Sequence, residues 1–397
     1  EEASHARRWL YGARLSASRR MRPLPGRTRA WYRSRKSTMP VDHARRSAVA
    51  AIPAQCYARP AWKGLAYLGR AAALYAVSVA GLLATDAPLA VMALWLLGGL
   101  AIGALFVLGH DAAHGALFDS PRLCRRVGRL ALLASLHAYE PWVVGHNRIH
   151  HGHTGDRGFD FVWHPLTKTE YDALPRLARL LHRIEWTPWG AGLYYLRVLW
   201  WQRMMRLVPS ARHRRAFRRD RLLVLAYLGL VSLALVWGGA AHGGTIASGC
   251  WTWVKVFAVP WLVWNQLIGT TVYLHHIGPD IVWRERGRSR RWAGQIESTV
   301  NFRIPAWLNV FWQNIFLHVP HHVDPRIPFY ALPRAAEALT TVLGREMRGG
   351  RLRVATYVAT TRRCKLYDFE HGRWLGYDGA VVPTSSPSRS MGAATAR

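Results

Sequence analysis

The chain has 397 residues, 50% of them hydrophobic, with 54 lysine and arginine residues against 22 acidic residues. The apolar content excludes a disordered polymer, and four cysteines exclude a disulfide scaffold. A formal net charge of +32 would by itself suggest nucleic-acid binding. The hydrophobic residues, however, are gathered into long blocks rather than spread as in a soluble core. The sequence therefore indicates a membrane protein, and we expect no nucleic-acid partner.

Residues 1–62 form a basic N-terminal segment, and its first 38 residues, which are Arg-rich, lack the roughly 7–15-residue apolar core of a signal peptide. Met39 opens the stretch that leads into the first apolar block, so it is a candidate for the true start of the chain. We expect one membrane domain over residues 63–345. Residues 346–397 are predicted to form a cytoplasmic C-terminal segment, and the Ser/Pro/Gly-rich composition from about Gly379 predicts a disordered tail.

Four apolar blocks are each close to the ~20 residues that a helix needs to cross a bilayer. They cover residues 66–84, 88–109, 222–239 and 251–274. Three residues separate the first two blocks, and a short Gly/Ala-rich turn separates the last two. The sequence therefore predicts four transmembrane helices arranged as two hairpins.

The basic residues predict the orientation of these helices. The hairpin loops 85–87 and 240–250 contain no Lys or Arg, whereas the segments before, between and after the hairpins are basic. By the positive-inside rule the basic segments face the cytoplasm. Arg70 and Lys255 lie near the ends of their spans, where long side chains can reach the membrane surface. We therefore predict a multi-pass protein of a bacterial inner membrane. Its basic cytoplasmic segments are expected to be attracted to anionic lipid headgroups.

Histidines are numerous, 19 in all, and most fall in short clusters beside the predicted membrane surface. The clusters are GHDAAHG with His110 and His114, GHNRIHHGHTG with His146, His150 and His151, HVPHH with His318, His321 and His322, and the pair His275 and His276. Positions i and i+3 or i+4 share one face of a helix, so each of the first three clusters can present several imidazoles together. Three clusters on one side of the membrane favour metal binding. His182 and His213 are instead interpreted as helix-surface histidines without such a role.

The ligand types restrict the metal and the reaction. Two ions in a shared site would need roughly eight ligands, which is about what these clusters supply. The sequence has no HExxH motif of zinc proteases, and the apolar blocks and histidine clusters contain no Glu-x-x-His pattern of ferritin-like di-iron bundles. An all-imidazole site at a membrane surface suits activation of O₂ by iron or copper.

The segments HDAAH, HNRIHH and HVPHH resemble the three histidine boxes of the membrane fatty acid desaturase family. YEPWVVGHNRIHHGHTG followed by DFVWHPLTKTEYDAL, and QIESTVNFRIPAWLN before HVPHHVDPRIP, resemble its Δ12/omega-6 branch. The resemblance covers roughly residues 52–340. It implies an all-α integral membrane protein whose four transmembrane helices, in two hairpins, support a cytoplasmic helical cap that carries the boxes.

The resemblance also implies a ligand set. The metal ligands would be His110, His114, His146, His150, His151, His276, His318, His321 and His322. His276 takes the position of a further family ligand after the last membrane helix, and His275 the position of the family's glutamine. Asp111, inside the first box, is expected to orient an imidazole, as ligating histidines usually require.

By the same resemblance, the protein would use two iron ions, O₂ and two external electrons to insert a cis double bond into a long-chain fatty acyl group. A mid-chain methylene has no acidic proton, so a general base alone could not remove its hydrogen. The sequence contains neither the HPGG segment of a fused cytochrome b5 nor a GxGxxG nucleotide fingerprint. We therefore expect a separate, small acidic electron donor, a ferredoxin or cytochrome b5-like protein, attracted by the basic cytoplasmic face.

Two alternatives remain open. A carotenoid ketolase, an acyl hydroxylase or an alkane hydroxylase could use the same boxes on the same scaffold, although the DFVWHPLTKTEYDAL match favours a desaturase. A membrane metal-binding or transport protein is a more distant alternative. Transport predicts ionisable residues within the spans, and these spans are nearly uncharged.

Overall fold

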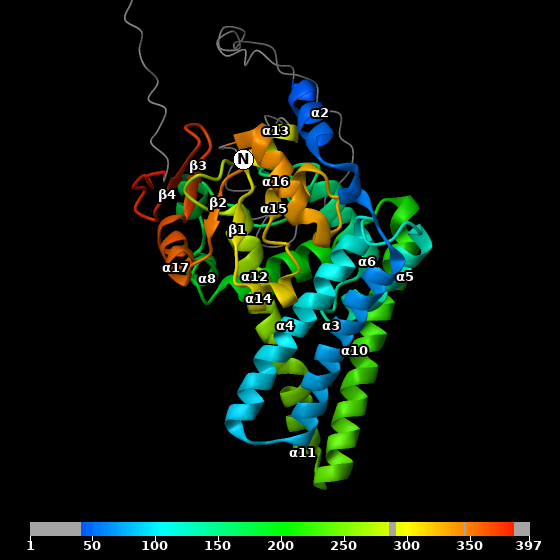
Figure 1. The fold of residues 1–397 in the computed structure, drawn as a ribbon. Coiled ribbons are helices and arrows are strands. Elements are labelled where there is room, and N and C mark those ends of the chain that lie inside the picture. Colours follow the sequence, from blue (N-terminus) through cyan, green and yellow to red (C-terminus); the bar gives the residue numbers. More distant parts are fainter. Residues whose placement is uncertain (1–40, 286–290, 345–346, 385–397) are drawn as a thin grey trace, which may run out of the picture.

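The computed structural model describes residues 41–285, 291–344 and 347–384. Long helices project from one side of a wider domain, which contains the remaining helices and four short strands (Figure 1). Met39, most of the basic N-terminal segment and the last 13 residues of the predicted tail lie outside the described residues. The described architecture is mostly helical, which confirms the predicted fold class.

Four stretches of helix are long and apolar enough to cross a membrane. They are Ala61–Ala84 (α3), Pro88–Ala113 (α4), Ala211–Gly243 (η5, Ala211–His213, and α10, Arg214–Gly243) and Ile246–His276 (α11, Ile246–Trp253; η6, Val254–Ala258; α12, Val259–His276). The helix α3 packs along α4, and α10 packs along α11, so the two predicted hairpins are present.

The helix α4 lies at the centre of this bundle. Of the 18 residues that form the apolar stretch of α4, 67% are buried, against 6% of the corresponding stretch of α10. The reason is that α4 packs against both α3 and α12. Small residues allow the close approach: a Cβ at Gly98 would meet Pro260, and one at Gly99 would meet Val263. Since α4 and α12 both end in histidines, their contact brings two of the clusters together.

Two charged residues of the spans are tied to the protein. The Lys255 side chain is 6% exposed and lies 2.5 Å from Asp86 and 3.0 Å from the carbonyl of Thr85, so it joins the second hairpin to the loop of the first. Arg70 donates to the carbonyl of Val310, 2.7 Å away, in α14 (Ala306–Trp312). Each of these two side chains therefore has a partner within the protein.

The domain that carries the histidine clusters is built from short helices. They are α5 (Pro121–Leu133), α6 (Tyr139–Trp142), η3 (Val143–His150), α7 (Lys168–Asp172), α8 (Arg176–Glu185), α9 (Ala191–Tyr194), η4 (Tyr195–Met205), α13 (Arg291–Glu297), α15 (His318–Val323), η7 (Phe329–Ala331), α16 (Leu332–Leu343) and α17 (Val354–Arg363). On the N-terminal side, α2 (Val41–Ala51) and η2 (Ala54–Tyr57) pack against α16. Both η3 and η4 are π-helical, a form that often occurs at functional sites.

Two small sheets complete this domain. β1 (Asn301–Arg303) pairs in parallel with β2 (Gly349–Arg351), and β3 (Leu366–Asp368) pairs antiparallel with β4 (Arg373–Leu375). Strands of three residues are too short to give an alternating pattern in the sequence. Residues 347–384 pack onto the domain. For example, the hydroxyl of Tyr357 donates to the carbonyl of Pro188 at 2.8 Å.

Candidate metal centre

The histidine clusters reach one buried region from four segments. The end of α4 carries His110, and His114 caps it; η3 carries His146 and His150, with His151 directly after it; α12 ends at His276; and α15 contains His318, His321 and His322. Among these side chains His114 is partly exposed, and the others are buried. Segments separated by more than 200 residues thus contribute to one site.

The imidazoles form two groups of four. The first histidine group is His110, His114, His146 and His321, and the second histidine group is His150, His276, His318 and His322. Within each group the potential ligand nitrogens all lie within 4.8 Å of one another. Nitrogens that bind one ion at about 2.1 Å lie about 3–4 Å apart, so each group has the dimensions of a single-ion site.

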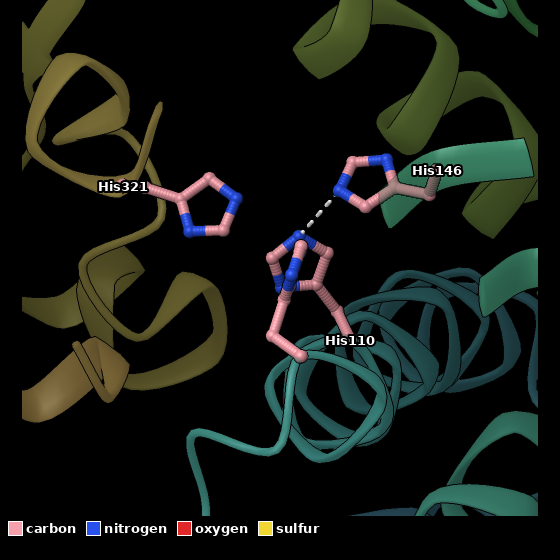
Figure 2. Close-up of side chains that lie close together, drawn as sticks. His110, His146 and His321 are labelled. Carbon is pink, nitrogen blue, oxygen red and sulfur yellow. Dashed lines mark hydrogen bonds between the residues drawn. The ribbon is translucent and has the colours of Figure 1, made fainter. Parts of the chain in front are cut away.

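Figure 2 shows His110, His146 and His321 turned toward a common point from separate segments. The Nε2 atoms of His110 and His146 are 2.9 Å apart. His151 adds a fifth imidazole here, because its Nε2 atom lies 3.2 Å from Nε2 of both His146 and His321. Its ring also stacks on His322 at 4.3 Å, so His151 lies between the two groups.

The sequence boxes do not map onto the groups one to one. His146 and His150 belong to different groups, although an α-helix would place them on one face. The π-helical form of η3 changes that spacing. In α15 the i, i+4 pair His318 and His322 enters the second group, whereas His321 points to the first.

The protonation state of the groups suits metal binding. Burial, reinforced by the neighbouring imidazoles, holds the pKa of His146, His151, His318, His321 and His322 well below 6.5. These rings are therefore neutral at pH 7, which is the form that ligates a metal. The Nε2 atoms of His114 and His150 are buried without a hydrogen-bond partner among the described residues. A metal ion in each group would satisfy these nitrogens, so the residues fit such an ion.

Asp111 lies where the sequence placed it, beside a histidine of the first box. The Nδ1 atom of His110 donates to Oδ1 of Asp111 at 3.0 Å. The other carboxylate oxygen accepts from the backbone N–H of Phe329 at 2.6 Å. Asp111 therefore fixes the orientation of the His110 ring and links α4 to the segment after α15.

Three further groups that orient imidazoles were missed in the sequence. The Nδ1 atom of His150 donates to Asp160 at 2.7 Å, that of His322 to Gln295 at 2.8 Å, and that of His276 to the carbonyl of Ser298 at 3.0 Å. Burial would raise the pKa of Asp160, but the contacts with His150 and with the N–H of Gly155 hold it below its usual value. Asp160 opens DFVWHP, so a carboxylate next to an apolar stretch was the available signal for it, whereas Gln295 and the backbone carbonyl of Ser298, in the polar segment QIES, had no such signal.

The adjacent residues His275 and His276 have different surroundings. His276 contributes to the second histidine group, whereas His275 belongs to neither group. The ring of His275 stacks on His318 at 3.8 Å, and its buried Nε2 atom has no hydrogen-bond partner in the described chain. His275 thus packs against a member of the second group.

The interpretation of His182 as a surface histidine is wrong. Its side chain is 6% exposed, because the segment with β3 and β4 covers α8, and its Nδ1 atom lies 3.0 Å from the hydroxyl of Tyr377. Burial lowers the pKa of His182 to about 3. His213 is partly exposed and accepts a hydrogen bond from Arg148 at 2.9 Å. Neither residue belongs to a histidine group.

A mostly apolar cavity borders both groups. Its walls include Phe106, Trp142, Phe161, Ile268 and Ile315, together with His110 and His146 from the first group and His150, His276 and His318 from the second. The hydroxyl groups in the wall are used within the protein: Tyr195 donates to Nε2 of His137 at 2.8 Å, and Thr271 donates to the carbonyl of Leu267 at 2.8 Å. The cavity therefore suits a hydrocarbon chain.

Comparison with known proteins gives a consistent result. A family model described as fatty acid desaturase matches residues 85–347. The chain is 28% identical over 279 residues to the chloroplastic omega-6 fatty acid desaturase of Glycine max, covering 70% of this chain and 62% of that protein. The chain thus spans about three fifths of the length of this relative.

Two other relatives have different printed activities. The chain is 27% identical over 284 residues to the sn-1 oleoyl-lipid 12-desaturase of Picosynechococcus sp., covering 70% of this chain and 77% of that protein. It is 31% identical over 310 residues to a chloroplastic sn-2 acyl-lipid omega-3 desaturase (ferredoxin) of Helianthus annuus, covering 75% of this chain and 66% of that protein.

Proposed function

The chain belongs to the fatty acid desaturase family, and on that premise we propose that it introduces a cis double bond into a long-chain acyl group of a membrane lipid. One observation carries this proposal: both histidine groups border the same apolar cavity. An acyl chain in that cavity would lie beside the metal-binding nitrogens of each group. Two relatives with omega-6 or 12-desaturase names support a Δ12/omega-6 position for the double bond.

We propose two iron ions as the cofactor, one held by each histidine group and the first group completed by His151. Bound iron would supply the O₂-derived oxidising power that removal of hydrogen from an unactivated methylene requires. The protein contributes orientation. Asp111 and Asp160 each fix one imidazole through its Nδ1–H, which leaves Nε2 directed toward the group.

The cavity walls would position the substrate. Aromatic and aliphatic side chains exclude water from the space beside the histidines, which protects a reactive centre from side reactions. The hydroxyls of Tyr195 and Thr271 donate to acceptors within the protein, so they present no unpaired polar group to an acyl chain in the cavity. A methylene segment is therefore held by shape and apolar contact.

The electrons would come from a separate, small acidic protein, a ferredoxin or a cytochrome b5-like carrier. The printed name of the sunflower relative includes ferredoxin, which supports the first of these. Exposed arginines lie on α5 and at the start of α10, and such a face attracts an acidic partner. The absence of Lys and Arg from both hairpin loops supports a cytoplasmic position for this face in a bacterial inner membrane.

Product analysis tests this proposal. The full chain is produced in a host that makes only monounsaturated lipids, and fatty acid methyl esters are analysed by mass spectrometry. We expect a new diene with the native chain and none with His150→Ala or His321→Ala, which remove one imidazole from each group. His371→Gln is the control. His371 is exposed, pairs with Asp368 and belongs to neither histidine group.

Other outcomes would identify the alternatives. A hydroxylated acyl product would indicate an acyl hydroxylase on the same scaffold. Stoichiometric metal without any lipid product, in the presence of O₂ and a competent donor, would indicate a metal-binding or transport protein. Zinc rather than iron in active protein would overturn the cofactor assignment.

A further inference from the structure

The helix α10 begins with an arginine-rich turn at one end of a candidate membrane span. The sequence RRAFRRDR covers residues 214–221, and apolar residues follow from Leu222 onward. Arg214, Arg218 and Arg221 are separated by four and three residues, so they share one face of the helix. This face lines a groove with about 700 Å³ of empty space, together with Val208 of the segment that follows η4.

The groove retains its positive charge. Within the described chain, neither Arg214 nor Arg218 forms an ion pair, and both are exposed. The nearest acidic residue in the sequence, Asp220, is turned away from the groove. It accepts from Arg129 at 3.0 Å and from Arg219 at 2.8 Å, on the side of α10 that faces α5 and α6.

The third arginine of the groove joins it to the rest of the protein. Arg221 donates to the carbonyls of Met204 at 3.1 Å and Leu207 at 2.6 Å. Its guanidinium lies 5.3 Å from the ring of Phe217, which is buried beneath it. Its Nε atom is buried and has no hydrogen-bond partner among the described residues.

The rim of the groove is apolar on the side of the span. Val208 is 59% exposed and Leu222 is 56% exposed, and only 6% of the most apolar stretch of α10 is buried. An arginine cluster that continues directly into a lipid-facing surface fits a molecule with an anionic head and a hydrocarbon tail. A membrane phospholipid has both parts, and an Arg guanidinium matches a phosphate through two parallel hydrogen bonds.

We propose that this groove binds the phosphate of an anionic phospholipid from the leaflet next to the histidine-bearing domain. Arg214 and Arg218 contact the phosphate, and the acyl chains follow Leu222 along α10. This site is separate from the acyl cavity: the residues that line the two share no member. The proposal rests on the groove and its charges, and it is independent of the proposed activity.

Occupancy of the groove would stabilise a segment that reaches the metal centre. Arg221 holds the C-terminal end of η4, and Arg203 of η4 donates to the carbonyls of Asp160 at 3.0 Å and Val162 at 2.7 Å. The carboxylate of Asp160 in turn holds His150. Lipid binding therefore stabilises the backbone that presents Asp160 to the second histidine group.

Lipid retention and thermal unfolding of the full chain in detergent test the proposal. Native mass spectrometry counts bound lipid, and the unfolding midpoint is measured with phosphatidylglycerol, phosphatidylcholine or inorganic phosphate added. We expect phosphatidylglycerol to be retained and to raise the midpoint, whereas the other two have little effect. The double variant Arg214→Gln/Arg218→Gln should bind phosphatidylglycerol roughly 10- to 30-fold more weakly, since each basic residue near a membrane contributes to attraction.

The matched control is Arg125→Gln/Arg126→Gln, which removes two exposed arginines from α5 and hence the same charge. It should bind phosphatidylglycerol like the native chain. Equal losses from both double variants would show a diffuse basic surface and overturn the site. Stabilisation by inorganic phosphate as strong as that by phosphatidylglycerol would show a soluble anion site and overturn the lipid assignment.

Discussion

The two histidine groups differ in how firmly the protein holds them. Three of the four imidazoles in the second group are fixed at Nδ1 by a buried acceptor. In the first group, the described chain supplies such an acceptor to His110, namely Asp111. The buried Nδ1 atoms of His146 and His321 have no hydrogen-bond partner among the described residues, and His114 is partly exposed.

This difference indicates unequal preorganisation. An imidazole that is fixed through Nδ1 loses less freedom when Nε2 binds a metal, and the acceptor also raises its basicity as a ligand. The second group should therefore bind its ion more tightly. The first group, with one edge partly exposed, should exchange its ion more readily.

Substitution of a proposed ligand should have the largest effect. His276→Ala removes one imidazole from the second group and its hydrogen bond to Ser298, so we expect loss of iron from that group and loss of product. His275→Gln leaves all four nitrogens of the group in place and should keep iron and most of the activity. Iron content and diene yield of the two variants are measured together. An iron-poor His275→Gln beside an active His276→Ala would exchange the roles assigned to these two residues.

Asp160→Asn should have the next largest effect. Loss of an orienting partner of this kind typically lowers metal affinity about 10- to 100-fold. Asparagine keeps the size of the side chain but weakens its acceptor toward Nδ1 of His150. Iron titration of the metal-free protein measures the change, with Asp172→Asn as a control because Asp172 is exposed and paired with Lys168. An unchanged affinity would mean that the second group does not depend on this carboxylate.

Removal of the metal by a chelator should proceed in two phases. We expect the ion of the first group to leave about tenfold faster than that of the second, because one ring of the first group is partly exposed and fewer of its rings are fixed. The iron content is followed over time in the native chain and in Asp160→Asn. The variant should bring the two phases closer together, whereas a single phase in the native chain would show that the groups are equivalent.

The parts that could be read from the sequence depend on local patterns. Apolar blocks of membrane-spanning length gave the four helices, and the spacing of His110 and His114 placed both at the end of α4. The division into two groups could not be read, because it depends on the π-helical form of η3. The same applies to Gln295, which reaches His322 through α13 and so depends on packing between distant segments.

The burial of His182 illustrates the limit of a helix pattern. The helix α8 is strongly amphipathic and leaves Leu177 77% exposed, so its sequence is typical of a surface helix. The residues that cover His182 come from the C-terminal segment, including Tyr377, almost 200 residues later. The sequence around α8 contains no sign of that partner.

Three buried histidines outside both groups give an expected effect on stability that does not involve metal binding. Burial lowers the pKa of His137, His164 and His182 from 6.5 to about 3. Because the unfolded chain binds protons at these sites already near pH 6.5, protonation favours unfolding. Their contribution to stability is complete above pH 6.5 and is lost as the pH falls from 6.5 toward 3.

The metal-free protein separates this effect from ion release. Each of the three residues should account for up to about 1.4 kcal/mol of the free energy of unfolding per pH unit in that range. His182→Gln should therefore flatten the fall of the unfolding midpoint between pH 6.5 and pH 4, whereas His371→Gln, at an exposed position, should not. If His182→Gln left the pH dependence of the unfolding midpoint unchanged, the acid sensitivity would arise from the two histidine groups themselves. The hydrogen bonds at Nδ1 in the second group would then not prevent its protonation.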